Sequence, residues 1–324
     1  MYTLFYSFLG LLHFIAASLA LEPSQTFILR HVHTTHAESG RIRWTDVSDS
    51  DIQSSSSGTS STHDYALQSR SMKTHRPISQ TAFHAMRTNV RKLQQTRSPF
   101  DQNILERESL EWEEGDMDGP ALDKRETLLA LAKMTSNAYF HKDEPGWYDL
   151  GGNWTADHSI GWDPDVDGFR GHVFLSADNA TAVLSIKGTS AGIFGGGATI
   201  RKDKLNDNLL FSCCCARVDW TWSTVCGCYG GGNKCDQNCL EDSLVEESLF
   251  YQVGIHLYNN LTFMYPQANI WVIGHSLGGG LASLIGLTFG APVVTFEAVP
   301  ERLAAQRLHL PMPVSLTFPE NPRQ

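Results

Sequence analysis

The sequence has no excess of positive charge, because 25 Lys and Arg stand against 35 Asp and Glu and give a formal net charge of −10. Nucleic acid is therefore not an expected partner, since its phosphates require a basic surface. Cysteine is missing from residues 1–212 and 240–324, and all seven cysteines lie between Cys213 and Cys239. This crowding is typical of a local disulfide knot formed in an oxidising compartment, and the odd number leaves at least one thiol unpaired.

Charge is also missing near the amino terminus, from Leu4 to Leu21. As a helix these 18 residues span about 27 Å, close to the roughly 30 Å of a bilayer's hydrocarbon core. We expect residues 1–21 to be a signal anchor or a cleaved signal peptide, and Ser18-Leu19-Ala20 offers small residues for cleavage. A buried core helix is a poor alternative at the extreme terminus before a polar tail.

Residues 22–122 have little that could build a core, and we expect a lumenal linker, partly disordered. Residues 27–29 could form a short strand, and residues 48–63 are rich in Ser, Thr and Asp. Residues 65–100 hold seven Lys or Arg and no acid, with an amphipathic helix pattern over 83–93. That helix could lie on an anionic membrane or, as we favour, dock on the folded domain. Residues 101–126 hold ten acids against three bases and predict a solvated linker.

The most informative stretch runs from Asn269 to Gly290. An apolar run predicts a buried strand, and apolar residues at helical spacing follow Gly280. Between them, Gly274-His-Ser276-Leu277-Gly278 is a G-x-S-x-G elbow, which exposes a strained serine above a sheet. Glycine is expected at both ends because a β-carbon would collide where strand and helix close together. Ser276 is the candidate nucleophile and the Leu277 N–H a candidate oxyanion donor; the alternative is a plain glycine-rich turn.

Elements upstream of the elbow predict an α/β domain from about residue 123. Asp123 and Glu126 resemble a capping pair for a helix, one face of which carries Leu128, Leu131, Ala132, Thr135 and Tyr139. Strands are predicted over 172–175 and 181–187, separated by a turn at Asp178-Asn179.

After the second strand, Gly188-Thr189 occupies the position of a second oxyanion donor, and Thr189 could offer both its N–H and its hydroxyl. The glycine-rich loop at 192–197 lacks a Walker lysine, so it is a poor phosphate cradle. One helix is predicted over 241–263, with His256 on its surface and Pro266 closing it, and a further strand over 290–296.

The cysteine segment, residues 213–239, has zinc as its rival interpretation. Its spacings fit usual zinc sites poorly, so disulfides are favoured, with no connectivity derivable. The disulfide candidates are Cys213, Cys214, Cys215, Cys226, Cys228, Cys235 and Cys239. Trp220 and Trp222 could present an aromatic surface to lipid or only pack the knot. Glycosylation sequons occur at Asn153, Asn179 and Asn260.

These features together resemble the class 3 (fungal triacylglycerol lipase-like) α/β-hydrolases, and within them the fungal vacuolar lipases of autophagy. The resemblance covers residues 124–311 and the membrane segment, and the cysteine segment is its most specific part. The matching stretches are Arg125–Tyr139, Gly168–Phe174, Ile186–Gly192, Lys204–Cys239 and Ile270–Pro292.

The resemblance implies an α/β-hydrolase domain over 123–311 with Ser276 as nucleophile, Thr189 and Leu277 as the oxyanion pair, and no cofactor or metal. It implies hydrolysis of membrane phospholipids and triacylglycerol, with lipid membranes as partners, during breakdown of autophagic bodies and intravacuolar vesicles. It also implies a single-pass type II membrane glycoprotein that passes through the endoplasmic reticulum, Golgi and multivesicular bodies or endosomes to the vacuole.

The family's triad order is Ser, Asp, His, and both partners lie well downstream of the elbow. Here 48 residues follow Ser276, and residues 312–324 no longer resemble the family. Glu297 or Glu301 with His309 has the right order, but we interpret these as ordinary surface residues. A serine needs a base to take its proton. We therefore expect a truncated, nearly inactive lipase; the alternatives are a catalytically inactive, membrane-tethered lipid-binding protein and a peptidase on the same fold.

Overall fold

The computed structural model describes part of the chain. The described residues are 27–35, 42–46, 67–77, 112–141, 144–150, 168–176, 179–190, 200–215, 224–232, 234–247 and 249–310. Several predictions fall outside them: the apolar segment at 4–21, the polar stretch at 48–63, the helix pattern at 83–93, the loop at 192–197, and Trp220 with Trp222. In the part of the chain that is described, no helix has the length and apolar character needed to cross a membrane.

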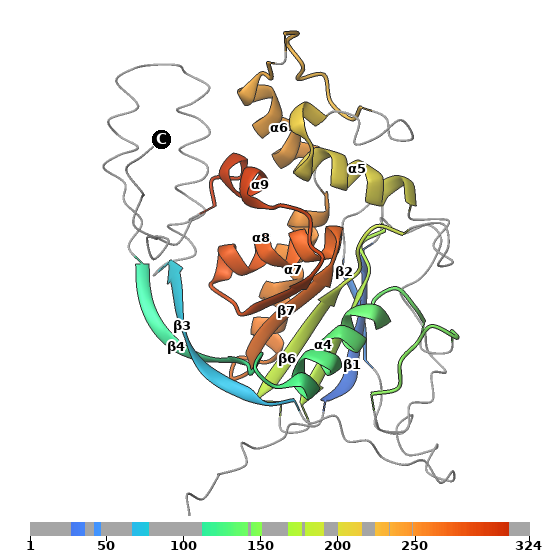
Figure 1. Cartoon of the computed structure of the whole chain (residues 1–324), viewed down its shortest axis with the longest axis vertical. Helices are drawn as coiled ribbons and strands as arrows, with labels where there is room; N and C mark the ends of the chain where they lie inside the picture. Colours follow the sequence, from blue (N-terminus) through green and yellow to red (C-terminus); the bar gives the residue numbers. More distant parts are fainter. Residues whose placement is uncertain are drawn as a thin grey trace, which may run out of the picture.

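A six-stranded mixed sheet forms the centre of the molecule, in the order β2-β1-β5-β6-β7-β8 (Figure 1). From β2 to β6 neighbouring strands are antiparallel, while β6, β7 and β8 run parallel. Parallel neighbours need crossover connections, and helices supply them here. The predicted α/β class is therefore confirmed. The strands are β1 Phe27–Thr35, β2 Ile42–Asp46, β5 Gly171–Ser176, β6 Thr181–Ile186, β7 Asn269–His275 and β8 Val293–Phe296.

The central strands are buried on both faces, which explains why their sequences read as continuous apolar runs. On β7, Ile270 and Val272 pack into one apolar core, whereas Trp271 and Ile273 pack into the other. Because successive side chains of a strand point to opposite faces, one strand serves two cores.

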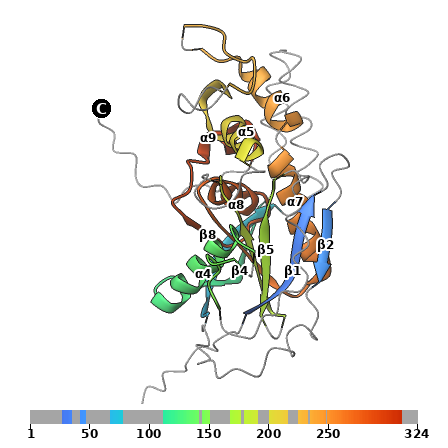
Figure 2. The same ribbon diagram turned by 90° about the vertical axis from the view of Figure 1, so that its right-hand side faces the viewer.

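Helices cover the two faces of the sheet. α7, Leu249–Met264, and α8, Leu277–Phe289, belong to the core on one face, and α4, Arg125–Asn137, to the core on the other. Figure 2 shows the sheet between α4 and α7. The predicted Asp123–Glu126 cap is wrong, because the N-cap of α4 is Lys124 and it makes no side-chain capping bond.

The remaining helices gather beyond the carboxyl end of β6 (Figure 1). They are α5 Ile200–Phe211, the short 3₁₀ helix η1 Cys213–Cys215, α6 Gln237–Glu247 and α9 Arg302–Arg307. The helix predicted over 241–263 corresponds to α6 and α7, which are described up to Glu247 and from Leu249. α6 begins earlier than expected because the Asp236 carboxylate accepts the N–H of Cys239 and so caps its first turn.

Two segments of opposite charge pair with each other as an antiparallel ribbon, β3 Ser69–Pro77 and β4 Trp112–Pro120. Lys73 lies 2.9 Å from Asp116, and Arg76 pairs with Glu113. The solvated linker predicted for the acidic run is thus wrong over β4, because the basic run supplies cross-strand partners. Trp271 Nε1 donates to the Asp118 carbonyl at 2.7 Å and ties this ribbon to β7.

Strands also form nearer the amino terminus than the expected domain boundary at residue 123. The short strand expected at 27–29 is confirmed and is longer: β1 pairs with both β2 and β5. The main sheet thus includes β1 and β2. Both strands lie within residues 22–122, for which the sequence predicts a linker.

Candidate active site

Ser276 lies on a sharp turn between β7 and α8, as predicted. Its backbone has φ 54° and ψ −123°, a region that residues with a side chain rarely adopt. A β-carbon on Gly274 would lie 2.3 Å from the Gly278 carbonyl oxygen, and one on Gly278 would lie 2.2 Å from the Ile186 carbonyl oxygen. Both predicted elbow glycines are therefore required by close backbone approach.

The loop after β6 lies directly against this elbow. A β-carbon on Gly188 would lie 2.3 Å from the His275 carbonyl oxygen and 3.2 Å from the Ser276 β-carbon. Thr189 follows Gly188, and Leu277 opens the first turn of α8, where N–H groups have no partner within the helix. The sequence-predicted oxyanion pair thus flanks Ser276 from two elements.

Two carboxylates of α5 hold this loop. Asp203 accepts hydrogen bonds from Lys187 Nζ at 2.8 Å and from the Ser190 N–H at 2.9 Å, and the Lys187–Asp203 pair is almost fully buried. The Thr189 hydroxyl donates to Asp207 at 2.9 Å. Burial raises the pKa of Asp207 to about 6, although the bond from Thr189 acts in the opposite direction.

The bond to Asp207 corrects one expectation about Thr189. A hydroxyl has one hydrogen to donate, and that of Thr189 is directed to Asp207. The Thr189 hydroxyl is therefore not available as a second oxyanion donor in this arrangement, which leaves its N–H.

Tyr139 is a site residue that the sequence pattern does not reveal, because the pattern places it only on one face of the helix expected after residue 123. Its hydroxyl accepts the Gly188 N–H at 3.0 Å and bonds to Nδ1 of His275 at 2.8 Å. The hydroxyl therefore bridges the backbone of the loop after β6 and the imidazole of His275. No local pattern could predict this contact, because 136 residues separate Tyr139 from His275.

A cavity of about 570 Å³ lies beside these groups. Its lining is mostly apolar, with Thr189 and His275 among the polar members and Phe140, Tyr148 and Phe296 among the aromatic ones. This volume is within the usual range of small-ligand sites. Ser276 follows the lining residue His275 in the chain, and the apolar lining suits an apolar group.

Within the described residues, no histidine or carboxylate forms a hydrogen bond with the Ser276 hydroxyl. Glu297 is exposed and lies 3.8 Å from Nε2 of His275. The interpretation of His309 as an ordinary surface residue is wrong. Its Nε2 lies 3.0 Å from the buried Glu241 carboxylate. His256 is exposed on α7, as predicted.

The cysteine segment forms three disulfides, as its crowding predicted. They are Cys214–Cys235, Cys215–Cys226 and Cys228–Cys239. Cys213 is free and exposed, which accounts for the odd number. The groups of three cysteines that could hold a metal ion all include disulfide-bonded sulfurs, so they fit zinc poorly.

Two of the three sequons lie in the described part of the chain. Asn179 is exposed in the turn between β5 and β6, and Asn260 is partly exposed on α7. Asn153 lies outside the described residues.

Comparison with known proteins adds family information. A family model described as "Lipase (class 3)" matches residues 241–297. Proteins named "Putative lipase ATG15" are similar over about two thirds of the chain. That of Cryptococcus neoformans var. neoformans serotype D (strain B-3501A) is 58% identical over 204 residues, which cover 63% of this chain and 39% of the relative. That of Mycosarcoma maydis is 52% identical over 214 residues, which cover 66% of this chain and 41% of the relative.

The chain spans about two fifths of the length of these curated relatives. Among solved structures, the Lip2 lipase of Yarrowia lipolytica is 17% identical, covering 54% of this chain and 59% of that one, with a TM-score of 0.25. A structural similarity this low carries no argument, so the relationship rests on sequence.

Proposed function

This chain is related to the fungal ATG15-type class 3 lipases, and on that premise we propose that it is a lipid ester hydrolase with Ser276 as nucleophile. The strained backbone of Ser276 between β7 and α8 carries the proposal. Such strain is typical of sites where a reactive side chain must be exposed. The loop holding Thr189 lies against the same turn, as acyl transfer requires.

In the proposed reaction, Ser276 Oγ attacks the acyl carbon of the ester and loses its proton to a general base. The N–H groups of Thr189 and Leu277 donate to the oxyanion of the tetrahedral intermediate. Collapse expels the alcohol and leaves an acyl-enzyme, which water hydrolyses. The apolar cavity beside Thr189 would receive the acyl chain.

We propose membrane phospholipids and triacylglycerol as substrates. The autophagy-related name of the relatives supports a role in the breakdown of autophagic bodies and intravacuolar vesicles. Residues 1–21 as a membrane anchor, delivery through endosomes to the vacuole, and glycosylation at the sequons complete this proposal.

The described residues do not supply a general base for Ser276. Among the described residues, no histidine forms a hydrogen bond with the Ser276 hydroxyl; His275 bonds to Tyr139 and His309 to Glu241. Loss of the histidine of a triad costs about 10⁶ in turnover. We therefore expect the 324-residue chain by itself to hydrolyse esters very slowly.

The direct test is fatty acid release from phosphatidylcholine vesicles by the 324-residue chain, its Ser276→Ala variant and a Ser283→Ala control. Ser283 lies on α8 and is partly exposed. We expect slow release that Ser276→Ala abolishes and Ser283→Ala preserves. Release unaffected by Ser276→Ala would overturn the proposal, and rapid Ser276-dependent release would overturn only the expected slowness.

A lipid-binding protein without turnover is the second candidate, favoured by the lack of a base at Ser276 among the described residues. Co-sedimentation with the same vesicles separates the two functions. Binding that persists in both variants, with no Ser276-dependent release over days, would favour lipid binding.

A further inference from the structure

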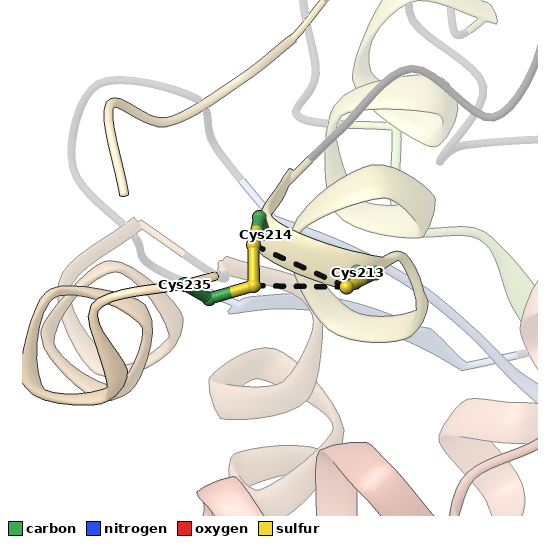
Figure 3. Close-up of side chains that lie close together, drawn as sticks. All are labelled: Cys213, Cys214 and Cys235. Atoms are coloured by element: carbon green, nitrogen blue, oxygen red, sulfur yellow. Dashed lines mark hydrogen bonds between the residues drawn. A yellow bond between two sulfur atoms is a disulfide. The ribbon is translucent and has the colours of Figure 1, made fainter. Parts of the chain in front are cut away.

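Three sulfur atoms meet at the end of α5. Cys214 and Cys235 form a disulfide, and Cys213, next to Cys214 in the chain, has an exposed free thiol. The Cys213 sulfur lies 3.6 Å from the sulfur of Cys235 and 4.0 Å from that of Cys214. Figure 3 shows the Cys213 sulfur beside the disulfide. This cluster has no part in the proposed ester hydrolysis.

We propose that Cys213, Cys214 and Cys235 form a thiol–disulfide exchange site. The Cys213 thiolate attacks Sγ of Cys235, a Cys213–Cys235 bond forms and the Cys214–Cys235 bond breaks. Cys214 leaves as a thiolate and takes up the proton that Cys213 lost. The numbers of disulfides and of thiols stay the same, so the step needs neither an oxidant nor a reductant.

Cys235 is the sulfur attacked, for reasons of geometry. Attack on Cys214 would join two adjacent residues, whose Cα atoms are about 3.8 Å apart, closer than the roughly 4.4 Å at which usual disulfides begin. Cys214 is also buried, at 4% exposure, whereas Cys235 is partly exposed.

The approach requires a side-chain rotation. Because the Cys213 sulfur is almost equally far from both bonded sulfurs, it lies beside their bond and not on its extension. In-line attack therefore requires the Cys213 side chain to turn about its Cα–Cβ bond, and its exposure leaves it room to do so.

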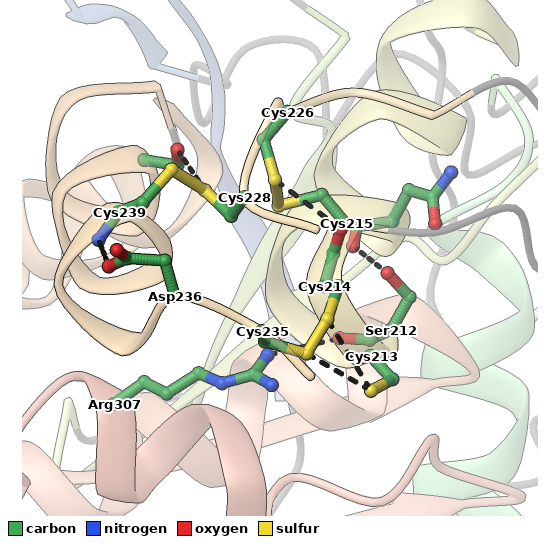
Figure 4. Close-up of a disulfide and its surroundings, with 12 residues drawn as sticks. Ser212, Cys213, Cys214, Cys215, Cys226, Cys228, Cys235, Asp236, Cys239 and Arg307 are labelled. Carbon is green, nitrogen blue, oxygen red and sulfur yellow. Dashed lines mark hydrogen bonds between the residues drawn. A yellow bond between two sulfur atoms is a disulfide. The ribbon is translucent and has the colours of Figure 1, made fainter. Parts of the chain in front are cut away.

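Arg307 of α9 provides a positive charge at this site. It donates from Nη1 to the Ser212 carbonyl at 3.0 Å, and Figure 4 shows its guanidinium near the Cys213–Cys235 pair. Burial lowers the pKa of Arg307, while its attraction to Cys213 and Glu241 acts in the opposite direction. The Arg307 charge would stabilise the negative charge that passes from Cys213 to Cys214 during the exchange.

Exchange moves the free thiol from an exposed to a buried position. In the observed pairing, thiol reagents reach Cys213. In the exchanged pairing the thiol belongs to Cys214, which is buried. Thiol reactivity of the folded chain therefore reports which pairing is present.

The test is disulfide mapping of the 324-residue chain without reduction, after incubation at pH 8 or pH 5 and quenching in acid. Fragmentation must resolve the three adjacent cysteines. We expect a Cys213–Cys235 bridge that grows with time at pH 8 and much more slowly at pH 5. Exclusive Cys214–Cys235 pairing after prolonged incubation at pH 8 would overturn the proposal.

Variants sharpen this result. Cys214→Ser is expected to form the Cys213–Cys235 bridge, with Cys215–Cys226 and Cys228–Cys239 as internal controls for folding. If both controls form while Cys213 and Cys235 stay free, the proposal fails.

The role given to Arg307 has its own matched pair. Arg307→Gln should slow the wild-type exchange several-fold, whereas Arg302→Gln, an exposed arginine on the same helix, should leave the rate unchanged. Equal exchange rates in the two variants would show that Arg307 does not assist the exchange.

Discussion

The Tyr139 hydroxyl lies 2.8 Å from Nδ1 of His275 and 3.0 Å from the Gly188 N–H. One hydroxyl group thereby joins three parts of the site: the segment after α4, the loop after β6 and the elbow after β7. Burial raises the pKa of Tyr139, so the hydroxyl keeps its hydrogen while it accepts the Gly188 N–H. Tyr139 thus holds the loop after β6 against His275, the residue before Ser276.

Tyr139→Phe should destabilise the fold. The change removes the partner of the Gly188 N–H and of His275 Nδ1, and an unpaired buried polar group costs about 1–3 kcal/mol. Urea denaturation measures this loss, with Tyr148→Phe, an exposed tyrosine of the same cavity, as the control. A loss no larger than that of the control would contradict the assigned role.

Gly278→Ala should abolish stable folding. The added β-carbon would lie 2.2 Å from the Ile186 carbonyl oxygen, and a backbone atom in the centre of the sheet cannot move away cheaply. We expect a cost of more than about 4 kcal/mol, within reach of the whole stability of a domain. Gly227→Ala, where a β-carbon has nothing within 4 Å, is the matched control, and equal soluble yield of both variants would refute the packing argument.

His172 should make the fold sensitive to acid. Burial lowers its pKa to about 4, and it donates from Nε2 to the Asn137 carbonyl at 2.9 Å. The unfolded chain, with a pKa near 6.5, binds a proton that the folded chain excludes between about pH 4 and pH 6.5. Stability from this group is complete above pH 6.5 and falls by roughly 3 kcal/mol as the pH drops to 4.

The measurement compares free energies of unfolding at pH 7 and pH 4 for wild type, His172→Gln and His256→Gln. The wild type and the exposed His256 variant should lose more stability on acidification than His172→Gln does. Parallel pH profiles for all three proteins would contradict a neutral buried His172.

The elbow could be predicted from sequence because its causes are local. A β-carbon at Gly274 or Gly278 would clash with atoms of the same turn or of the adjacent β6, and the apolar run before them predicts β7 directly. The odd cysteine was predictable by counting alone.

Contacts between distant segments account for the other misses. The acidic run alone predicts a solvated linker, and only its antiparallel register with the basic run brings Lys73 to Asp116. Likewise, nothing near Thr189 in the sequence shows that Asp207 accepts its hydroxyl hydrogen. These features depend on which elements the fold places side by side.

The most direct test of the account is prolonged labelling of the 324-residue chain with a fluorophosphonate ester, followed by mapping of the adduct. A fluorophosphonate reacts with activated serines, and the elbow geometry with the N–H groups of Thr189 and Leu277 should direct it to Ser276 even when reaction is slow. We expect a single adduct on Ser276, and we expect no adduct when the chain is unfolded in urea before labelling. An adduct on another serine, or no adduct on Ser276 in the folded chain, would contradict the claim that Ser276 is the nucleophile.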